Sequence, residues 1–213
     1  MLVTHVMAPG PAGGAENVVL EGCAALLEQG HELTLRILIE ARCPQHGKRL
    51  IEAAHNKGIP TQALWVRGRI DPRAVGALRA ALREGPDEIV HAHGYKALVY
   101  GLLSRSKASS FVVTHHGETS DTRLARLYER IARALYRRVD RVFAVSHATT
   151  EALAEAGVPR SKLGTVPNPI SLGAPNAHSE ARGDGLHLLF LGRLSPEKGL
   201  DVLLRALASP RAP

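Results

Sequence analysis

Apolar and polar residues along the chain alternate in two kinds of segment. Short aliphatic runs such as Leu2–Met7 and Phe111–Thr114 are typical of buried strands. Each run is followed by a longer segment in which apolar residues recur every three or four positions, as on one face of a helix. Up to residue 170 the strand-like segments are Leu2–Met7, Glu32–Ile39, Thr61–Val66, Glu88–His91, Phe111–Thr114, Arg141–Val145 and Lys162–Val166.

The segments between these strands have helical periodicity. Asp71 and Pro72 form the clearest start signal, because Asp is a preferred N-cap and Pro suits the first helical position. Strands and helices that alternate at this spacing predict an α/β fold, a doubly wound parallel sheet of about six or seven strands with right-handed connections. The expected helices are Ala15–Gln29, Lys48–Asn56, one that starts at Asp71, Ala97–Ser104, Asp121–Val139 and His147–Ala156.

The composition changes around residues 171–185, which are polar, contain Gly and Pro and lack periodicity, as a linker does. Beyond them, Leu186–Leu191 has strand character and Gly199–Ala208 has helical character. A single strand and helix have nothing against which to bury an apolar face. We therefore expect an N-terminal domain in residues 1–170, a linker in residues 171–185 and, in residues 186–213, the first β–α unit of a truncated second domain.

Composition narrows the environment and the partners. The 213 residues suffice for one full α/β domain, and 45% hydrophobic with 4% aromatic residues predicts an aliphatic core. A net charge of +7 favours anionic partners such as phosphates, nucleic acid or an acidic membrane surface. Two isolated cysteines, Cys23 and Cys43, favour a reducing compartment. With no signal peptide and no stretch long enough to span a bilayer, we expect a cytoplasmic protein whose membrane contact would be peripheral.

A glycine-rich turn follows the first strand. Gly13 and Gly14 stand just before the first helix, where backbone N–H groups and the helix dipole attract phosphate. The turn is not GxGxxG, and no ribose-binding acid follows at the usual distance, so a dinucleotide site is disfavoured. A tight strand-to-helix turn without a ligand is an equally good interpretation.

Histidines stand at the ends of two predicted strands. His91 and His93 lie two residues apart and should point the same way. A metal pair is disfavoured because no third ligand is evident nearby, and the alternative is one buried histidine with one at the cleft. His115 and His116 follow the next strand, and the carboxyl ends of parallel strands share one edge. Because two strands place histidines at that edge, a purely structural role for these histidines is less favoured.

A basic turn lies near the C-terminus. Arg193 and Lys198 flank a turn between a predicted strand and helix, where a guanidinium and an ammonium group can clamp a pyrophosphate. A solvated basic loop would not explain Gly192 and Gly199 on either side of it.

The segment that holds this turn, FLGRLSPEKGLDVLLRAL, resembles the opening of the donor-binding domain in group 1 (family 4) retaining glycosyltransferases of the GT-B fold. PAGGAE, DEIVHAHG, VVTHHG, RVFAVSHATTEAL and VPNPI resemble upstream motifs of that family in order and spacing. The resemblance spans nearly the whole chain. It implies the N-terminal, Rossmann-like half of a GT-B architecture and the start of the donor domain.

The resemblance implies transfer of a sugar from a nucleoside diphosphate sugar to an acceptor hydroxyl with retention. The acceptor, a saccharide or a lipid-linked saccharide as in polysaccharide biosynthesis, would lie on the first domain. Arg193, Lys198 and the N–H groups near Gly13 and Gly14 would meet the charge of the leaving diphosphate. No metal or other cofactor is expected.

The resemblance also assigns roles to single residues. His116 matches the histidine that reaches the transferred sugar and is the candidate catalytic residue, while His115 has no such match and would support it. Glu16 and His93 match less closely, as residues that line the cleft. Asn168 belongs to the VPNPI turn, where Pro169 replaces the usual glycine, so the turn should differ locally.

The predicted helix Asp121–Val139 divides into an apolar and a basic face. The basic face is either simply solvated or contacts anionic lipid headgroups or a phosphate-bearing acceptor. Nucleic acid is disfavoured, because few aromatic residues are present to stack on bases. The residues of the basic face are Arg126, Arg130, Arg133 and Arg137.

Two other functions stay open at this point. The glutamate pair of the family's donor domain has no counterpart before Pro213, so we expect the 213-residue chain alone to be inactive. It could instead be a non-catalytic half that binds an acceptor or a partner subunit. A nucleotide-sugar epimerase shares the two-domain architecture, although the Arg193 to Lys198 segment argues against it.

Overall fold

The structure is a computed structural model. It describes residues 1–10, 13–82, 85, 87–106, 108–117, 123–170, 187–192, 194 and 198–209, and for residues 123–126 it describes the backbone alone. The chain divides into two compact units, Met1–Ser171 and Leu172–Pro213, and each is described by itself.

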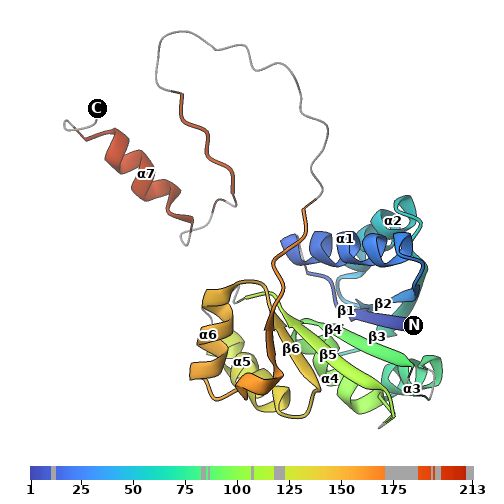
Figure 1. Cartoon of the computed structure of the whole chain (residues 1–213). Helices are drawn as coiled ribbons and strands as arrows, with labels where there is room; N and C mark the ends of the chain where they lie inside the picture. The colour runs from blue at the N-terminus through green and yellow to red at the C-terminus, as the bar shows by residue number, and fades with distance from the viewer. Residues whose placement is uncertain are drawn as a thin grey trace. The chain divides into compact units, whose positions relative to one another are not determined.

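The described part of the first unit holds one sheet of seven parallel strands in the order β3-β2-β1-β4-β5-β6-β7. This confirms the predicted doubly wound α/β fold and its number of strands. The order reverses between β1 and β4, since the chain first builds outward to β3 and then returns to the other side of β1 (Figure 1). The strands are β1 (Leu2–Met7), β2 (Glu32–Glu40), β3 (Thr61–Val66), β4 (Glu88–His93), β5 (Ser110–His115), β6 (Arg141–Ala144) and β7 (Leu163–Thr165).

Helices cover both faces of this sheet. The helices α1 and α2 pack on one face against β1 and β2, and α3, α4 and α5 pack on the other (Figure 1). The core between these layers is mainly aliphatic, as the composition predicts, and also contains Tyr100, Phe111 and Tyr136. The helices of the first unit are α1 (Gly14–Glu28), α2 (Pro44–Asn56), α3 (Pro72–Ala81), α4 (Gly94–Ser104), α5 (Arg123–Tyr136), α6 (His147–Glu155) and the short η1 (Arg160–Lys162).

Local chemistry explains where several elements start and end. The Asp71 carboxylate accepts hydrogen bonds from the N–H groups of Arg67 (2.9 Å) and Arg73 (3.0 Å), which confirms Asp71 as the N-cap of α3. The helix α2 starts at Pro44, four positions before its predicted start, with proline again in the first turn. The helix α5 ends at Tyr136 rather than Val139, because the Arg138 N–H group bonds only three residues back, to the Leu135 carbonyl.

The strand β4 is two residues longer than predicted. It continues to His93, which pairs with Met7 of β1 on one side and with Thr114 of β5 on the other. Flanking strands on both sides keep the backbone extended through His91 and His93, so both side chains lie on the same face of the sheet.

The second unit contains α7 (Leu200–Leu207), which agrees with the predicted helix Gly199–Ala208. The predicted strand Leu186–Leu191 is wrong over residues 187–191, which have no regular structure. Leu188, Leu189 and Leu191 are exposed, and α7 has no buried residue. A strand needs a neighbour to satisfy its N–H and C=O groups, and the described residues of this unit provide none.

Candidate functional site

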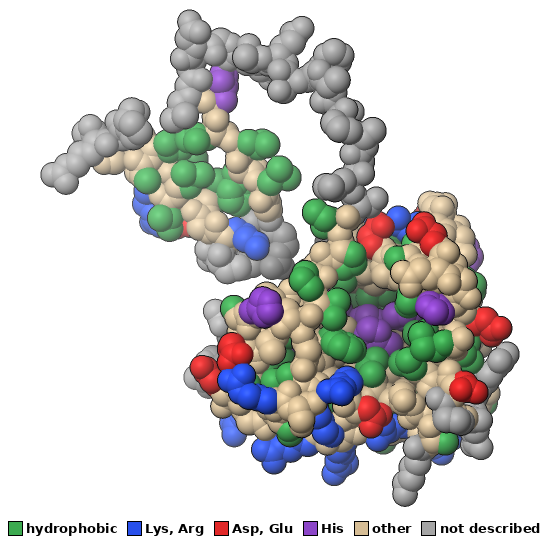
Figure 2. Space-filling view, viewed as in Figure 1, with side chains coloured by type: hydrophobic (Ala, Val, Ile, Leu, Met, Phe, Trp, Pro, Cys, Tyr) green, Lys and Arg blue, Asp and Glu red, His purple; other side chains and the backbone are tan. Residues whose placement is uncertain are grey.

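The candidate site lies where the strand order reverses, at the carboxyl ends of β1, β4 and β5. In open α/β sheets, ligands bind in the crevice beside such a point. The ends of these strands bring Met7, His93 and His115 to one edge of the sheet. Histidine side chains lie near the middle of the face shown in Figure 2, among hydrophobic ones.

Three histidines come together from two adjacent strands. His5 of β1 is directly opposite His91 of β4, and His93 follows on the same face of β4. Their ring centroids lie 4.2–5.1 Å apart. His5 and His93 are buried, with exposed fractions of 3% and 5%, and His91 is partly buried.

A chain of hydrogen bonds leads from this cluster to His116. His5 Nδ1 lies 2.8 Å from His93 Nε2, and His93 Nδ1 lies 3.2 Å from His116 Nε2. His91 is not part of this chain of hydrogen bonds, because its Nε2 bonds to Thr114 Oγ1 at 2.8 Å. His115 points elsewhere, to the Tyr136 hydroxyl of α5 at 3.0 Å. The structure thus links His93 to His116 and directs His115 toward a helix.

Burial keeps these imidazoles neutral near pH 7. It lowers the pKa of His5 to about 4. It also lowers the pKa of His116 to about 4, with a smaller contribution from His115 and an opposing one from the carboxylate of Glu16. Burial, together with the neighbouring histidines, holds the pKa of His91 and of His93 well below the usual value. Each ring therefore carries one N–H donor and one acceptor nitrogen.

No third metal ligand is evident near His91 and His93 in the sequence, but the structure brings His5 beside them. Within the described residues, His5, His91 and His93 are a group whose ligand atoms all lie within 4.8 Å of one another. The geometry nevertheless favours hydrogen bonding, because His5 Nδ1 and His93 Nε2 face each other at 2.8 Å rather than a common point. Holding a metal ion at ~2.0–2.1 Å would require both rings to turn. A polar residue inside the apolar run Leu2–Met7 was the signal that could have found His5.

The glycine turn lies beside the histidine chain. Gly13 precedes α1, and Gly14 is its first residue. The Glu16 carboxylate accepts a hydrogen bond from the Gly10 N–H group at 2.8 Å and lies so close to Gly13 that a Cβ there would overlap it. Glu16 thus closes the turn, and its charge acts on His116. The charge of Glu16 thus links the turn after β1 electrostatically with the histidine after β5.

The model of the family described as Glycosyltransferase Family 4 matches residues 12–173, about three quarters of the chain. The chain belongs to glycosyltransferase family 4. The match covers the helices and strands of the family 4 domain from α1 to β7, including Gly13, His93 and His116. Among curated proteins, no match was found.

Solved structures share the fold of this family 4 domain. Anabaena Alr3699/HepE in complex with UDP and glucose superposes with a TM-score of 0.61 at 19% identity, over 80% of this chain and 45% of that chain. The same protein in complex with UDP-glucose superposes with a TM-score of 0.60 at 19% identity, over 80% of this chain and 44% of that chain. The N-terminal domain of Candida albicans trehalose-6-phosphate phosphatase superposes with a TM-score of 0.51 at 12% identity, over 78% of this chain and 48% of that chain. This chain thus spans less than half the length of these structures, and the likeness concerns the fold.

Three other predicted site residues belong to the end of the family 4 domain and to the second unit. Asn168 is exposed in the segment after β7. Lys198 is exposed in the turn before α7 of the second unit, and Arg193 lies outside the described residues. The roles predicted for these three residues stay predictions.

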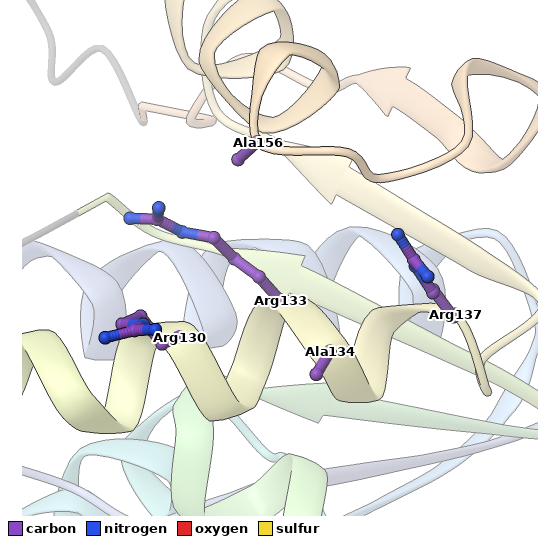
Figure 3. A pocket seen from close by; sticks show the side chains of 5 residues that line it. All are labelled: Arg130, Arg133, Ala134, Arg137 and Ala156. Carbon is purple, nitrogen blue, oxygen red and sulfur yellow. The ribbon is translucent and has the colours of Figure 1, made fainter.

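The predicted basic face of α5 forms part of a cavity. Arg130 and Arg133 of α5 and Arg137, which directly follows α5, line a cavity of about 510 Å³ together with Ala134 and with Ala156, which follows α6 (Figure 3). Arg130 and Arg137 are exposed, and Arg133 is partly buried. Arg133 also pairs with Glu129 at 3.8 Å, and Arg137 donates to the Gly157 carbonyl at 3.3 Å. The side chain of Arg126 lies outside the described residues.

No helix in the described part of the chain is both long enough and apolar enough to cross a membrane.

Proposed function

We propose that this family 4 domain binds the acceptor, and one side of the donor, in a glycosyltransferase that moves a sugar from a nucleoside diphosphate sugar to an acceptor hydroxyl. The supporting observation is the position of His116. It lies beside the point where the strand order reverses, is bonded to His93 and is influenced by Glu16 from the glycine turn. In this proposal a ligand beside the carboxyl ends of β1, β4 and β5 contacts the N-terminus of α1 and the His116 imidazole at the same time.

In this proposal the glycine turn meets the leaving diphosphate. The first N–H groups of α1 have no partner within the helix, and the helix dipole favours negative charge at that end. The bond from the Gly10 N–H group to Glu16 holds the turn in place before a donor arrives. In the same proposal, the positive charges of Arg193 and Lys198 stabilise the leaving diphosphate. These groups compensate the diphosphate charge, so the proposed reaction requires no metal ion or other cofactor.

His116 is the proposed catalytic residue. A neutral imidazole can donate to, or accept from, a sugar hydroxyl without bringing charge to the reacting carbon, and burial holds His116 in that form. We propose retention of configuration, with the acceptor attacking from the face that the diphosphate leaves. Turnover also requires the nucleotide site of a donor domain, so we expect the 213-residue chain alone to be inactive.

An NMR titration tests this function separately from turnover. Nucleoside diphosphate sugars that include UDP-glucose are added to the labelled chain. We expect shifts at the amides of Gly13 and Gly14 and at the ring of His116. His116→Ala should weaken binding about tenfold, while His31→Ala, just before β2 at the opposite edge of the sheet, should not. Shifts confined to other surfaces with every donor would refute the proposal.

Product analysis separates transfer from epimerisation. When an equimolar donor domain is supplied, release of free nucleoside diphosphate from a donor that binds should increase on addition of an acceptor. Conversion of the donor to an epimer, without release, would favour the epimerase. Donor binding without release in the presence of an equimolar donor domain would favour a non-catalytic half.

We also propose that the cavity beside α5 binds the phosphate of a lipid-linked or otherwise anionic acceptor, at the inner face of a membrane. Three guanidinium groups around one cavity suit a phosphate, and the unpaired Cys23 and Cys43 suit a cytoplasmic location. Attraction to an anionic surface contributes ~1 kcal/mol per arginine and weakens with salt.

Vesicle binding tests this cavity. Binding to phosphatidylglycerol vesicles at low salt should exceed binding to phosphatidylcholine vesicles, and Arg130→Ala combined with Arg133→Ala should reduce it at least tenfold. The matched control combines Arg49→Ala with Arg138→Ala, which removes the same two charges from exposed residues that do not line the cavity. Competition by inorganic phosphate would identify a soluble phosphate site instead, and equal loss in the control would leave only a solvated basic face.

A further inference from the structure

We propose that His5 and His93 are positioning residues that set which nitrogen of His116 carries the proton, and that the three imidazoles change tautomer as one unit. The chain of hydrogen bonds stands on its own geometry. Its importance for sugar transfer rests on the proposed function of His116.

The rings of this chain meet edge to edge. His5 and His93 are nearly coplanar, at 11°, and their centroids are 5.1 Å apart. With 2.8 Å between the facing nitrogens, this separation leaves the rings side by side in one plane instead of face to face. His93 and His116 have a similar arrangement, at 34° and 5.4 Å. In-plane contacts direct an N–H group at a lone pair, as a hydrogen bond requires.

The pattern of bonded atoms restricts the tautomers. Both bonds join an Nδ1 atom to an Nε2 atom, first from His5 to His93 and then from His93 to His116. A neutral imidazole that donates from one nitrogen accepts at the other. All three rings must therefore carry the proton on Nδ1, or all three must carry it on Nε2. Any mixed arrangement places two N–H groups, or two lone pairs, against each other.

The donor-to-acceptor direction of these hydrogen bonds can be set only at the two ends of the histidine chain. Among the described residues, His5 Nε2 at one end and His116 Nδ1 at the other are buried without a hydrogen-bond partner. In either direction one end bears an N–H group and the other a bare lone pair. The Nδ1 atom of His116 is buried and has no partner, so a sugar hydroxyl that reached it would select the direction of the whole chain.

Other polar groups near the chain do not belong to it. His91 touches the rings of His5 and His93, but its Nε2 bonds to Thr114. The charges of Glu16 and His115 act on His116. His91 therefore offers a control histidine of similar surroundings outside the chain.

Long-range proton–nitrogen NMR of the full ¹⁵N-labelled chain at pH 7 tests the proposal. It reads the protonation of each ring nitrogen directly. We expect His5, His93 and His116 to be neutral and to share one tautomer, whichever it is. A mixed set, or a charged ring among the three, overturns the proposal.

Substitutions test the coupling between the rings. In His5→Phe and in His93→Phe, which keep an aromatic ring of similar size, His116 should lose its single tautomer and show averaged nitrogen shifts. In His91→Phe the three rings should keep their pattern. Amide spectra identify any variant that fails to fold, and the variants at positions 5 and 93 are read independently. An unchanged His116 spectrum in a folded variant at either position overturns the proposal.

Two further additions separate the competing explanations. One equivalent of zinc should leave the pattern unchanged, and a joint shift of His5, His91 and His93 would identify them as metal ligands and overturn the proposal. Addition of UDP-glucose tests the link to function. If the three rings share a tautomer but no nucleoside diphosphate sugar affects His116, the proposed function fails and the coupled chain stands.

Discussion

Residues 2–7 of the first unit and residues 187–191 of the second are alike in apolar character but differ in structure. Both are short apolar segments that lead through a glycine turn into a helix. The first forms β1, with five of six residues buried between β2 and β4. The second has no strand structure, and Leu189 and Leu191 are more than 80% exposed. An apolar segment therefore becomes a parallel strand only where neighbours accept its hydrogen bonds and cover both its faces.

The helices that follow show the same contrast. The helix α1 buries Val19, Leu20 and Cys23, whereas α7 buries none of its residues. Burial of one such aliphatic side chain contributes ~1.5–3 kcal/mol, which α1 gains several times and α7 does not. Stability is therefore concentrated in the first unit, and substitutions in the two units should differ in effect.

The largest effect should come from a charge in β1. Val6 is fully buried, so Val6→Asp should cost more than ~4 kcal/mol, because an unpaired carboxylate loses its hydration there. Val6→Ala, which should still fold, should cost ~2 kcal/mol. Leu189→Asp should change the free energy of unfolding by less than ~0.5 kcal/mol. Urea denaturation measures all three, and similar costs at positions 6 and 189 would contradict the contrast between the units.

Acid should weaken the first unit through its histidines. The pKa of His5 and of His116 is lowered to about 4, so in the unfolded chain these residues bind protons more readily than in the folded one. Stability is unaffected above the ordinary pKa of 6.5 and falls as the pH drops from there toward 4. The slope is ~1.4 kcal/mol per pH unit for each histidine. Thermal unfolding at a series of pH values measures this slope. His5→Gln should reduce the slope by the contribution of one histidine. An unaltered slope would show that His5 is protonated in the folded chain.

The smallest expected effect compares two acidic residues near helix starts. Asp71 caps α3 through the N–H group of Arg73 and also accepts a hydrogen bond from the N–H group of Arg67 before the helix, whereas Asp201 of α7 forms an exposed ion pair with Arg205. Asp71→Ala should lower the free energy of unfolding by ~1 kcal/mol, because two N–H groups lose their acceptor. Asp201→Ala should lower it by less than ~0.5 kcal/mol. Chemical denaturation of both variants makes the comparison, which would fail if the exposed pair contributed as much as the cap.

The sequence by itself determined the alternation of strands and helices, because apolar periodicity and turn residues are local properties. It also determined the cap at Asp71 and the edge of the sheet at which His93 and His116 emerge. The histidine at position 5 was missed, because its partner comes from β4, 88 residues away, through a register that no local pattern encodes. The turn of His115 toward Tyr136 depended in the same way on where α5 packs.

Only the tertiary structure decided which apolar segments became strands and which polar side chains met. The strand β4 continued to His93 because β1 and β5 flank it, and residues 187–191 remained irregular where the described residues of their unit offer no flanking strand. Hydrogen bonds between strands and between side chains join residues far apart in sequence. Their partners are therefore set by packing, while the preference of each segment for helix or strand is set by its own residues.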